Sequence, residues 1–156
     1  MNIFVIDPAT HVCARALDDL RLNKMIIETA QLLSAALRLH GYNGTDVYKT
    51  THVNHPCAIW ARTSSGNYNW LLNYFDDLCL ERAARTGKTH KTENLRYAFA
   101  KNKTIIPIGD QTVWPNCTPY KHIADIHEAY RLTLIDKWKN DKRPPKWTNG
   151  FKPQWA

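Results

Sequence analysis

The sequence predicts an all-α protein: a single compact domain, residues 1–156, of several packed helices joined by long functional loops. Three observations predict this fold class. Residues 15–40 contain no Gly or Pro and carry apolar side chains at helical spacing. Gly41 and Gly87 stand where two such runs end, as helix-terminating glycines do. Gly, Pro, Asn and Thr gather between the runs, as is typical of surface loops.

The first helix is predicted over about residues 15–40, followed by a surface loop over residues 41–56. A second helix should run from about residue 57 or 64 to residue 85, and a short third helix over about residues 92–101. The expected buried side chains of the three helices are Leu22, Ile26, Ala30, Leu33 and Leu37, then Trp70, Tyr74 and Leu78, then Leu95, Ala98 and Phe99.

The last helix is expected after a loop, residues 104–119, that several prolines interrupt. Thr118 followed by Pro119 fits an N-cap and a first helical position. The helix should end before Pro144. Its predicted buried side is formed by Ile123, Ile126, Tyr130, Leu134 and Trp138.

The positive charge of the chain is local. The formal net charge is +7, and residues 137–152 hold six Lys and Arg against one Asp, which gives five of the seven excess charges. A C-terminal tail, about residues 139–156, interleaves these cations with aromatic side chains. A localised basic patch indicates a polyanionic partner, although a solubilising charged tail is the alternative.

Cysteine usage and the first residues indicate a reducing, intracellular setting. The four cysteines are scattered, with no CxxC motif and no dense framework. MNIFVIDPAT lacks a basic start followed by an apolar run, so no signal peptide is expected. No stretch approaches the roughly 20 apolar residues of a membrane span. We therefore expect a cytoplasmic protein that does not bind membranes.

Glu28 is the first candidate catalytic residue. On a helix, Arg21, Lys24 and Gln31 lie broadly on its polar face. A lone carboxylate among cations stays ionised, because positive charge favours its charged form. It can then stabilise an oxocarbenium-like sugar cation or take a proton from a neighbouring carbon. The alternative is an ordinary solvent-exposed face of ion pairs.

The α-amine of the chain is the second candidate. An α-amine has a pKa of about 7.7–8.0, against roughly 10.4 for lysine, so part of it is neutral and nucleophilic at physiological pH. Asn2 is large enough that Met1 should be retained, and Met1 would then carry the amine. Asn2 itself is a predicted DNA contact.

The loop motif THVNHPCAIWAR brings His52, Asn54, His55 and Arg62 close together in the sequence. We expect these residues to contact DNA or to order the loop by hydrogen bonds. His52, His55 and Cys57 are also residue types that bind metals. No second ligand pair stands at a zinc-site spacing, so no metal site is predicted.

The tail is the strongest binding signal. Lys142, Arg143, Lys146 and Lys152 can neutralise phosphates, and Trp147 can stack on a base. The alternative is that the tryptophans cap the core while the cations face solvent.

Four segments carry a resemblance to a known family: MNIFVIDP, DLRLNKMIIETAQLLSA with Glu28 on it, NHPCAIWAR, and RPPKWTNGFKPQWA. In this order they resemble the pyrimidine-dimer DNA glycosylases of the endonuclease V type, found in phages and bacteria, over about half of the chain. The resemblance implies an all-α enzyme that needs no metal or cofactor. Its N-terminal amine, here on Met1, would attack the deoxyribose C1′ and release the base through a Schiff base. Glu28 would be the acid/base group, and strand cleavage would follow.

The resemblance departs at three positions around Glu28. Two arginines of the family pattern fall at Ile27 and Gln31, and a histidine falls at Arg21. The lyase chemistry is compatible with these changes, but the excised base stays open between a pyrimidine dimer and another damaged or modified pyrimidine.

The sequence therefore predicts a monomeric DNA N-glycosylase with associated abasic-site lyase activity, acting on double-stranded DNA by extruding a nucleotide. Two alternatives stay open. One is a metal-dependent nuclease built on His52, Asn54 and His55. The other is a non-catalytic DNA-binding protein on the same helical scaffold.

Overall fold

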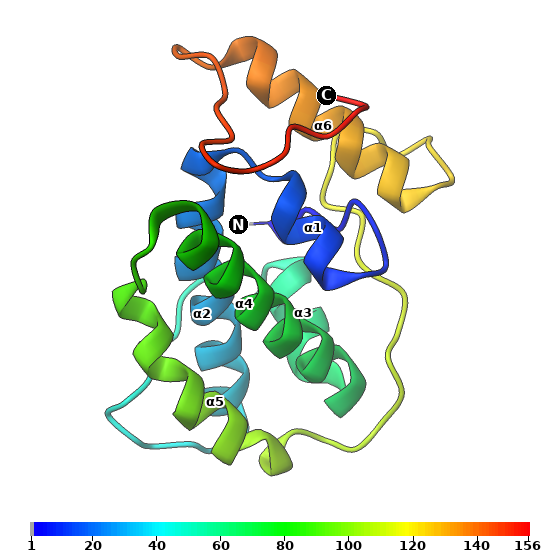
Figure 1. Cartoon of the computed structure of the whole chain (residues 1–156). Coiled ribbons are helices and arrows are strands. Elements are labelled where there is room, and N and C mark those ends of the chain that lie inside the picture. The colour runs from blue at the N-terminus through cyan, green and yellow to red at the C-terminus, as the bar shows by residue number, and fades with distance from the viewer. Residues whose placement is uncertain (1) are drawn as a thin grey trace.

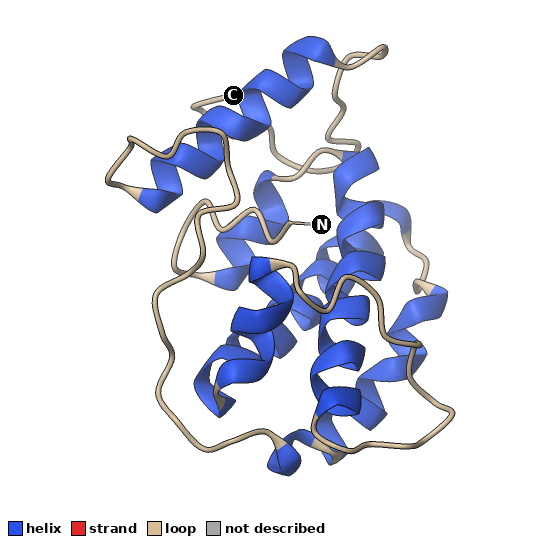
Figure 2. Ribbon diagram, turned by 180° about the vertical axis from the view of Figure 1, so that it is seen from behind, coloured by secondary structure: helices blue, strands red, loops and turns tan. Residues whose placement is uncertain are grey.

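The computed structural model describes residues 2–156, and these residues form helices and loops with no strand (Figures 1 and 2). The predicted all-α class is confirmed. The elements in chain order are α1 (Thr10–Ala16), α2 (Asp19–Leu39), α3 (Pro56–Thr63), α4 (Ser65–Thr86), the 3₁₀-helix η1 (Lys91–Leu95), α5 (Arg96–Lys101), the 3₁₀-helix η2 (Lys103–Ile105) and α6 (Ile126–Asn140).

Of two predicted helix starts one is wrong and the other is confirmed, and at both a capping side chain begins the helix without a Gly or Pro. The predicted helix over residues 15–40 is divided at Asp18, whose carboxylate accepts the Arg21 N–H at the start of α2. The second helix begins at the later of its two predicted starts: the Ser64 hydroxyl accepts the Asn67 N–H and caps α4, while residues 56–63 form the separate helix α3. Such N-caps offer the backbone a partner that replaces a helical one.

Helices α2 and α4 pack against each other and form the centre of the core. All predicted apolar positions of the first two helical stretches are buried, from Leu22 to Leu37 on α2 and from Trp70 to Leu78 on α4. Close packing also explains Gly66 near the start of α4. A Cβ there would lie 2.3 Å from the Gln111 backbone nitrogen, because the loop after η2 passes directly over it.

The last helix begins later than Thr118–Pro119, so this prediction is wrong. Thr118 instead forms a turn, in which its hydroxyl accepts the Tyr120 N–H at 3.1 Å. Asp125 caps α6 by accepting the His127 N–H at 2.9 Å. Ile123 consequently precedes the helix, whereas Tyr130, Leu134 and Trp138 are buried as predicted.

After α6 the C-terminal tail passes the start of α2 and then runs back to α6, where the chain ends (Figure 1). Three indoles hold it there. Trp147 lies edge-on to Trp138 with ring centroids 5.1 Å apart, and Trp155 stacks on the same ring at 5.6 Å. The Trp147 N–H donates to the Ala16 carbonyl at 3.0 Å. The tail is therefore anchored by its aromatic residues.

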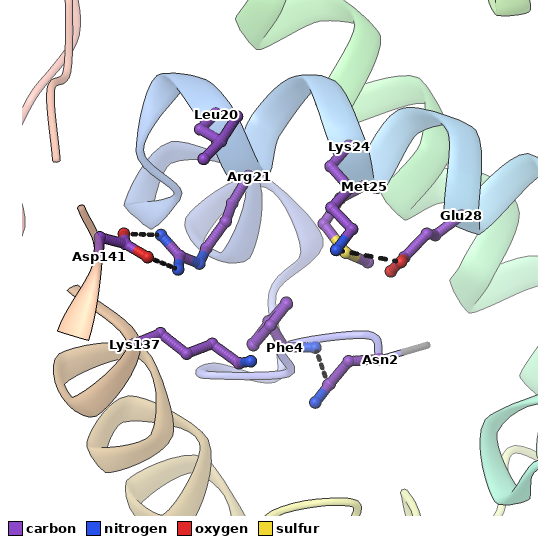
Figure 3. A pocket seen from close by; sticks show the side chains of 9 residues that line it. All are labelled: Asn2, Phe4, Leu20, Arg21, Lys24, Met25, Glu28, Lys137 and Asp141. Carbon is purple, nitrogen blue, oxygen red and sulfur yellow. Dashed lines mark hydrogen bonds and ion pairs between the residues drawn. The ribbon is translucent and has the colours of Figure 1, made fainter. Parts of the chain in front are cut away.

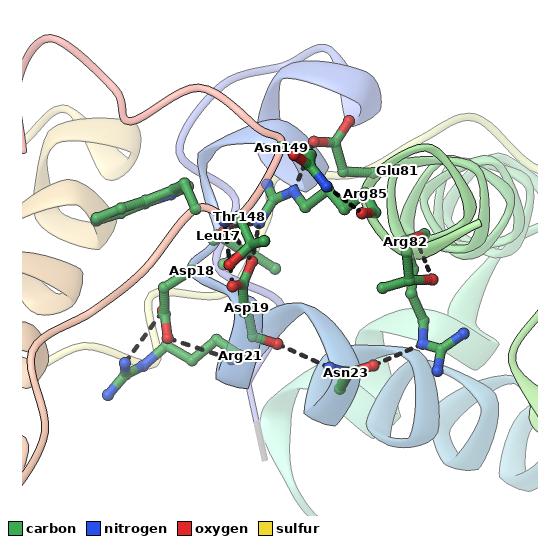
Figure 4. A network of polar contacts seen from close by, with 12 residues as sticks. Leu17, Asp18, Asp19, Arg21, Asn23, Glu81, Arg82, Arg85, Thr148 and Asn149 are labelled. Carbon is green, nitrogen blue, oxygen red and sulfur yellow. Dashed lines mark hydrogen bonds and ion pairs between the residues drawn. The ribbon is translucent and has the colours of Figure 1, made fainter. Parts of the chain in front are cut away.

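A buried arginine near the end of α4 joins four parts of the chain (Figure 4). The Arg85 side chain is 2% exposed, and its Nη1 and Nη2 donate to the carbonyls of Leu17 and Arg15 at 2.9 and 3.0 Å. These carbonyls lie at the end of α1, where a helix leaves carbonyls without intrahelical partners. The guanidinium also pairs with Glu81 at 2.9 Å and with Asp19 at 3.1 Å.

The tail completes this network. Asp19 accepts the Thr148 N–H at 3.2 Å, and the Asn149 amide donates to the Arg85 carbonyl at 3.0 Å. Burial raises the pKa of Asp19, but hydrogen bonds from Thr148 and Arg85 outweigh it and hold the pKa below its usual range. Position 150 favours glycine, because a Cβ there would lie 2.7 Å from the Arg85 Nε.

In the part of the chain that the structure describes, no helix is both long enough and apolar enough to cross a membrane.

Arg85→Met should strongly destabilise the fold. It leaves the carbonyls of Leu17 and Arg15 and the carboxylate of Asp19 without their interior donor. We expect the free energy of unfolding in urea to fall by about 3–5 kcal/mol. Arg82→Met, on the same helix but with exposed partners, is the matched control and should cost less than about 1 kcal/mol. Equal losses in the two variants would contradict the assignment.

Candidate active site

A pocket of about 340 Å³ lies between the N-terminal segment, α2 and α6 (Figure 3). Helix α2 contributes one wall because residues spaced by three or four positions face the same side of a helix. The polar side chains on this wall are Arg21, Lys24 and Glu28. The remaining lining residues are Asn2, Phe4, Leu20, Met25, Lys137 and Asp141. The predicted polar face of the helix thus opens into a pocket.

Glu28 is partly enclosed by this pocket. Its side chain is 18% exposed, and among residues 2–156 its ion-pair partner is the Lys24 ammonium, at 3.9 Å. Lys24 is 68% exposed, so this is a loose surface contact that contributes little to stability. The carboxylate is therefore held on a rigid helix without being committed to a close structural pair.

The N-terminal segment is fixed against the protein just before the pocket. The Asn2 amide oxygen accepts the Phe4 N–H at 2.9 Å, and Phe4 has a φ of 45°, which non-glycine residues rarely adopt. Helix α6 holds the next residues: His127 Nδ1 contacts the Val5 carbonyl oxygen at 2.8 Å. This turn brings Asn2 to the pocket wall. The predicted nucleophile, Met1, lies outside the described residues.

Arg21 lines the pocket, but its guanidinium is engaged by two carboxylates. It donates to Asp141 through two hydrogen bonds, at 2.8 and 2.9 Å, and to Asp18 at 3.1 Å. The hydrogen bonds from Arg21 hold the pKa of Asp141 below its usual range. In this arrangement Arg21 joins the end of α6 to the first turn of α2.

The other predicted residue of α2, Gln31, is half-buried and does not line the pocket. In the loop before α3, His52 and Asn54 are exposed, whereas His55 caps the helix by accepting the Cys57 N–H at 3.1 Å. Arg62 donates to the Val53 carbonyl. The loop is thus ordered by hydrogen bonds, as one sequence-based alternative expected.

The cations of the tail face solvent. Lys142, Arg143, Lys146 and Lys152 are all exposed. Trp147 is half-buried against Trp138, and the Lys152 ammonium lies 6.0 Å from the centre of its ring. The arrangement is therefore the one that the sequence analysis gave as the alternative, in which the tryptophans cap the core while the cations face solvent. The aromatic side chain of the tail that does face solvent is Phe151, at 78% exposure.

The two charged pocket residues that were not predicted as site residues are Lys137 and Asp141. Lys137 is exposed on α6 and points towards Phe4 and Asn2 (Figure 3). Sequence spacing could not predict that these two residues line the pocket, because the two walls of the pocket are more than a hundred residues apart in the chain.

The residues that lie close enough together to hold a metal ion come partly from the loop motif and partly from a distant loop. Among the described residues, His55 and Cys57 form a cluster with Cys117, and His52 is not part of it. None of the three lines the pocket beside Glu28.

The family of this chain is evident from comparison with known proteins. The sequence model described as pyrimidine dimer DNA glycosylase matches residues 1–95, which is more than half of the chain. The chain belongs to the pyrimidine dimer DNA glycosylase family. The resemblance read from the motifs is confirmed. No curated protein and no solved structure matches the chain significantly.

Membership in the pyrimidine dimer DNA glycosylase family supports glycosylase activity, and with it DNA binding, in general. The matched residues include Asn2, Arg21, Lys24 and Glu28. Helix α6 and the tail lie beyond residue 95, so the wall that carries Lys137 and Asp141 is outside the match.

The pair of Arg21 and Asp141 should stabilise the closed arrangement of α2 and α6 in a pH-dependent way. A double-mutant cycle with Arg21→Gln and Asp141→Asn, measured by urea unfolding, should give a coupling of about 1 kcal/mol at neutral pH. The pKa of Asp141 is lowered in the folded state, so the coupling should be complete above the unfolded pKa of about 3.9. It should disappear as the pH falls through the lower folded value. A coupling that grows on acidification would contradict this assignment.

Proposed function

We propose that the protein is a DNA N-glycosylase with abasic-site lyase activity, acting on a damaged or modified pyrimidine in double-stranded DNA. The observation that carries the proposal is the shared pocket of Glu28 and Asn2. The Glu28 carboxylate shares this pocket with Asn2, and Met1, the proposed carrier of the α-amine, directly precedes Asn2 in the sequence. In Schiff-base chemistry at a sugar carbon, an amine can act as the nucleophile and a carboxylate as the acid–base group.

The proposed reaction begins when the neutral amine attacks C1′ of an extruded nucleotide. A C–N bond forms to the amine, the glycosidic C–N bond breaks, and the base leaves with the bonding electrons and takes up a proton. The Glu28 carboxylate stabilises the positive charge that develops on the sugar. The C1′–O4′ bond then breaks with its electrons going to O4′, and the nitrogen lone pair forms an imine with C1′. Of the two protons of the amine, one has passed to the departing base and the other passes to O4′.

Strand cleavage follows from the imine. The imine makes the C2′ proton acidic, and Glu28 is the group in the pocket that can take it as a general base. The electrons of the C–H bond form a C2′–C3′ double bond, and the 3′ phosphate leaves. Hydrolysis of the imine by water returns the free amine.

Exposed cations around the pocket would position the DNA. Lys24 and Lys137 come from opposite walls, and Lys146 and Lys152 extend the positive charge along the tail. Such phosphate contacts fix the register of a protein on DNA without reading its sequence. The pocket volume lies at the lower end of the range of about 300–1,000 Å³ for ligand sites, which fits a single extruded nucleotide.

Glu28→Gln should remove catalysis while DNA binding and folding persist. The substitution removes the charge but keeps the size of the side chain, which is only partly buried. We expect single-turnover excision and cleavage to slow by about 100-fold or more, the usual scale for a general acid–base group. Glu128→Gln, an exposed carboxylate at the start of α6, is the control and should react normally. A fully active Glu28→Gln variant would remove Glu28 from the mechanism.

Borohydride should trap the enzyme covalently on DNA through the N-terminal amine. Reduction of the imine gives a stable amine, so the complex survives denaturation, and peptide mapping should place the adduct on the first residue. A short N-terminal extension should abolish trapping, because it moves the amine out of the pocket. Substrates with a pyrimidine dimer, an abasic site or a modified pyrimidine would identify the excised base. An adduct on Lys24 would overturn the N-terminal nucleophile, and absence of trapping on all substrates would favour a non-catalytic DNA-binding protein.

Charge removal from the tail should weaken DNA binding without unfolding the protein. Lys146→Gln with Lys152→Gln should reduce the slope of log K against log salt by up to about 1.8, the value for two phosphate contacts. The control pair, Lys101→Gln with Lys103→Gln, lies at the opposite end of the molecule and should leave the slope unchanged (Figure 1). Equal slopes for all variants would remove the tail from the DNA interface.

A further inference from the structure

Two cysteines that are far apart in the sequence meet at the start of α3. Cys57 is fully buried in the first turn of the helix, and Cys117 lies in the loop before α6. Their sulfur atoms are 3.4 Å apart, and both cysteines are free thiols. The fold therefore brings together two soft ligand atoms.

The loop that carries Cys117 is held in place by a buried tyrosine of α6. The Tyr130 hydroxyl donates to the Pro115 carbonyl at 2.6 Å and accepts the Cys117 N–H at 3.2 Å. Tyr130 is itself fully buried. The position of the Cys117 sulfur is thus fixed by the core and does not depend on the loop alone.

A histidine supplies a third ligand atom. His55 precedes Cys57 by two residues, and a nitrogen of its ring and the two sulfur atoms all lie within 4.8 Å of one another. Tetrahedral zinc, with bonds of about 2.0–2.3 Å, needs ligand atoms about 3.6–3.8 Å apart. Movements of about 1 Å would therefore close the three atoms around one ion. A disulfide would use the two sulfurs alone and would not involve the imidazole.

We propose that His55, Cys57 and Cys117 bind a soft divalent metal ion of the zinc type, with water as the fourth ligand. Two thiolates and an imidazole are a ligand set that selects such ions over magnesium or calcium. Binding breaks two S–H bonds and releases two protons to solvent, while the ion takes a lone pair from the neutral imidazole.

The hydrogen bonds around the cluster allow His55 to exchange its hydrogen bond for a bond to the ion. The His55 Nδ1 lone pair now accepts the Cys57 N–H at 3.1 Å, and an ion would compete for it. That N–H also has the Cys117 sulfur as a hydrogen-bond partner, so it keeps an acceptor when the ion takes the imidazole. No buried donor is left without a partner.

The site would connect α3 and the loop before α6 with the N-terminal segment. The backbone of Ile3 is a hydrogen-bond partner of the Cys57 sulfur, and Ile3 directly follows Asn2 of the pocket. The ion would lie outside the pocket lining, so it would take no part in the Schiff-base chemistry. Its role would be to fix the segment that leads to the chain terminus. The proposal does not rest on the glycosylase activity.

Cobalt titration of the full-length, reduced protein under nitrogen tests the site directly. We expect one equivalent of Co²⁺ to give the thiolate charge-transfer and tetrahedral d–d absorption bands, and one equivalent of Zn²⁺ to abolish them. Cys117→Ser and His55→Gln should each raise the Kd for Co²⁺ by about 100-fold or more, since even residues outside the ligand set cost 10–100-fold. Cys79→Ser, a buried cysteine of α4, is the matched control and should bind normally.

Circular dichroism of each variant separates loss of the site from loss of the fold. Cys117 and His55 are only partly buried, so these two variants carry the test even if Cys57→Ser fails to fold. The proposal is overturned if the reduced protein shows no thiolate–cobalt bands, or if Cys117→Ser and Cys79→Ser bind alike. It is also overturned if the only change at these cysteines is a disulfide, seen as the loss of two hydrogens in the intact mass after oxidation.

Discussion

The buried guanidinium of Arg85 is the interaction on which the arrangement of the helices depends. The chain turns sharply between α1 and α2, and this turn leaves the carbonyls of Arg15 and Leu17 inside the protein. An unpaired carbonyl there would cost the desolvation energy of a buried polar group. Arg85 satisfies both carbonyls, and its charge is in turn balanced by Asp19 and Glu81. The same interaction sets the direction of α2 and gives the tail a place to dock.

The pocket follows from this arrangement. Helix α2 presents Glu28 from a rigid backbone, while α6 holds the N-terminal segment through contacts such as that between His127 and Val5. The pyrimidine dimer DNA glycosylase match covers the α2 wall and ends before α6. The wall that carries Glu28 and the wall formed by α6 thus come from different parts of the sequence, joined by Arg21 and Asp141.

Much of the fold and part of the pocket could be predicted from the sequence, and the predictions that were wrong have physical causes. Periodicity predicted the buried face of α2 and the polar face with Glu28, because both depend only on helical geometry. It missed the break at Asp18, where a capping side chain acts without a Gly or Pro signal, and it left two starts open for α4 until the Ser64 cap decided between them. It also could not place Lys137 or Cys117, since their neighbours are set by tertiary packing across more than fifty residues.

The docking of the tail has an optical consequence. The ring of Trp138 is nearly parallel to that of Trp155, at an interplanar angle of 22°, and is crossed by Trp147 at 75°. Indoles this close couple their electronic transitions, and a fixed angle between them makes the coupling chiral. The protein therefore carries its own near-ultraviolet signal for the position of its C-terminus. Release of the tail would weaken that signal while the helical far-ultraviolet signal stayed the same.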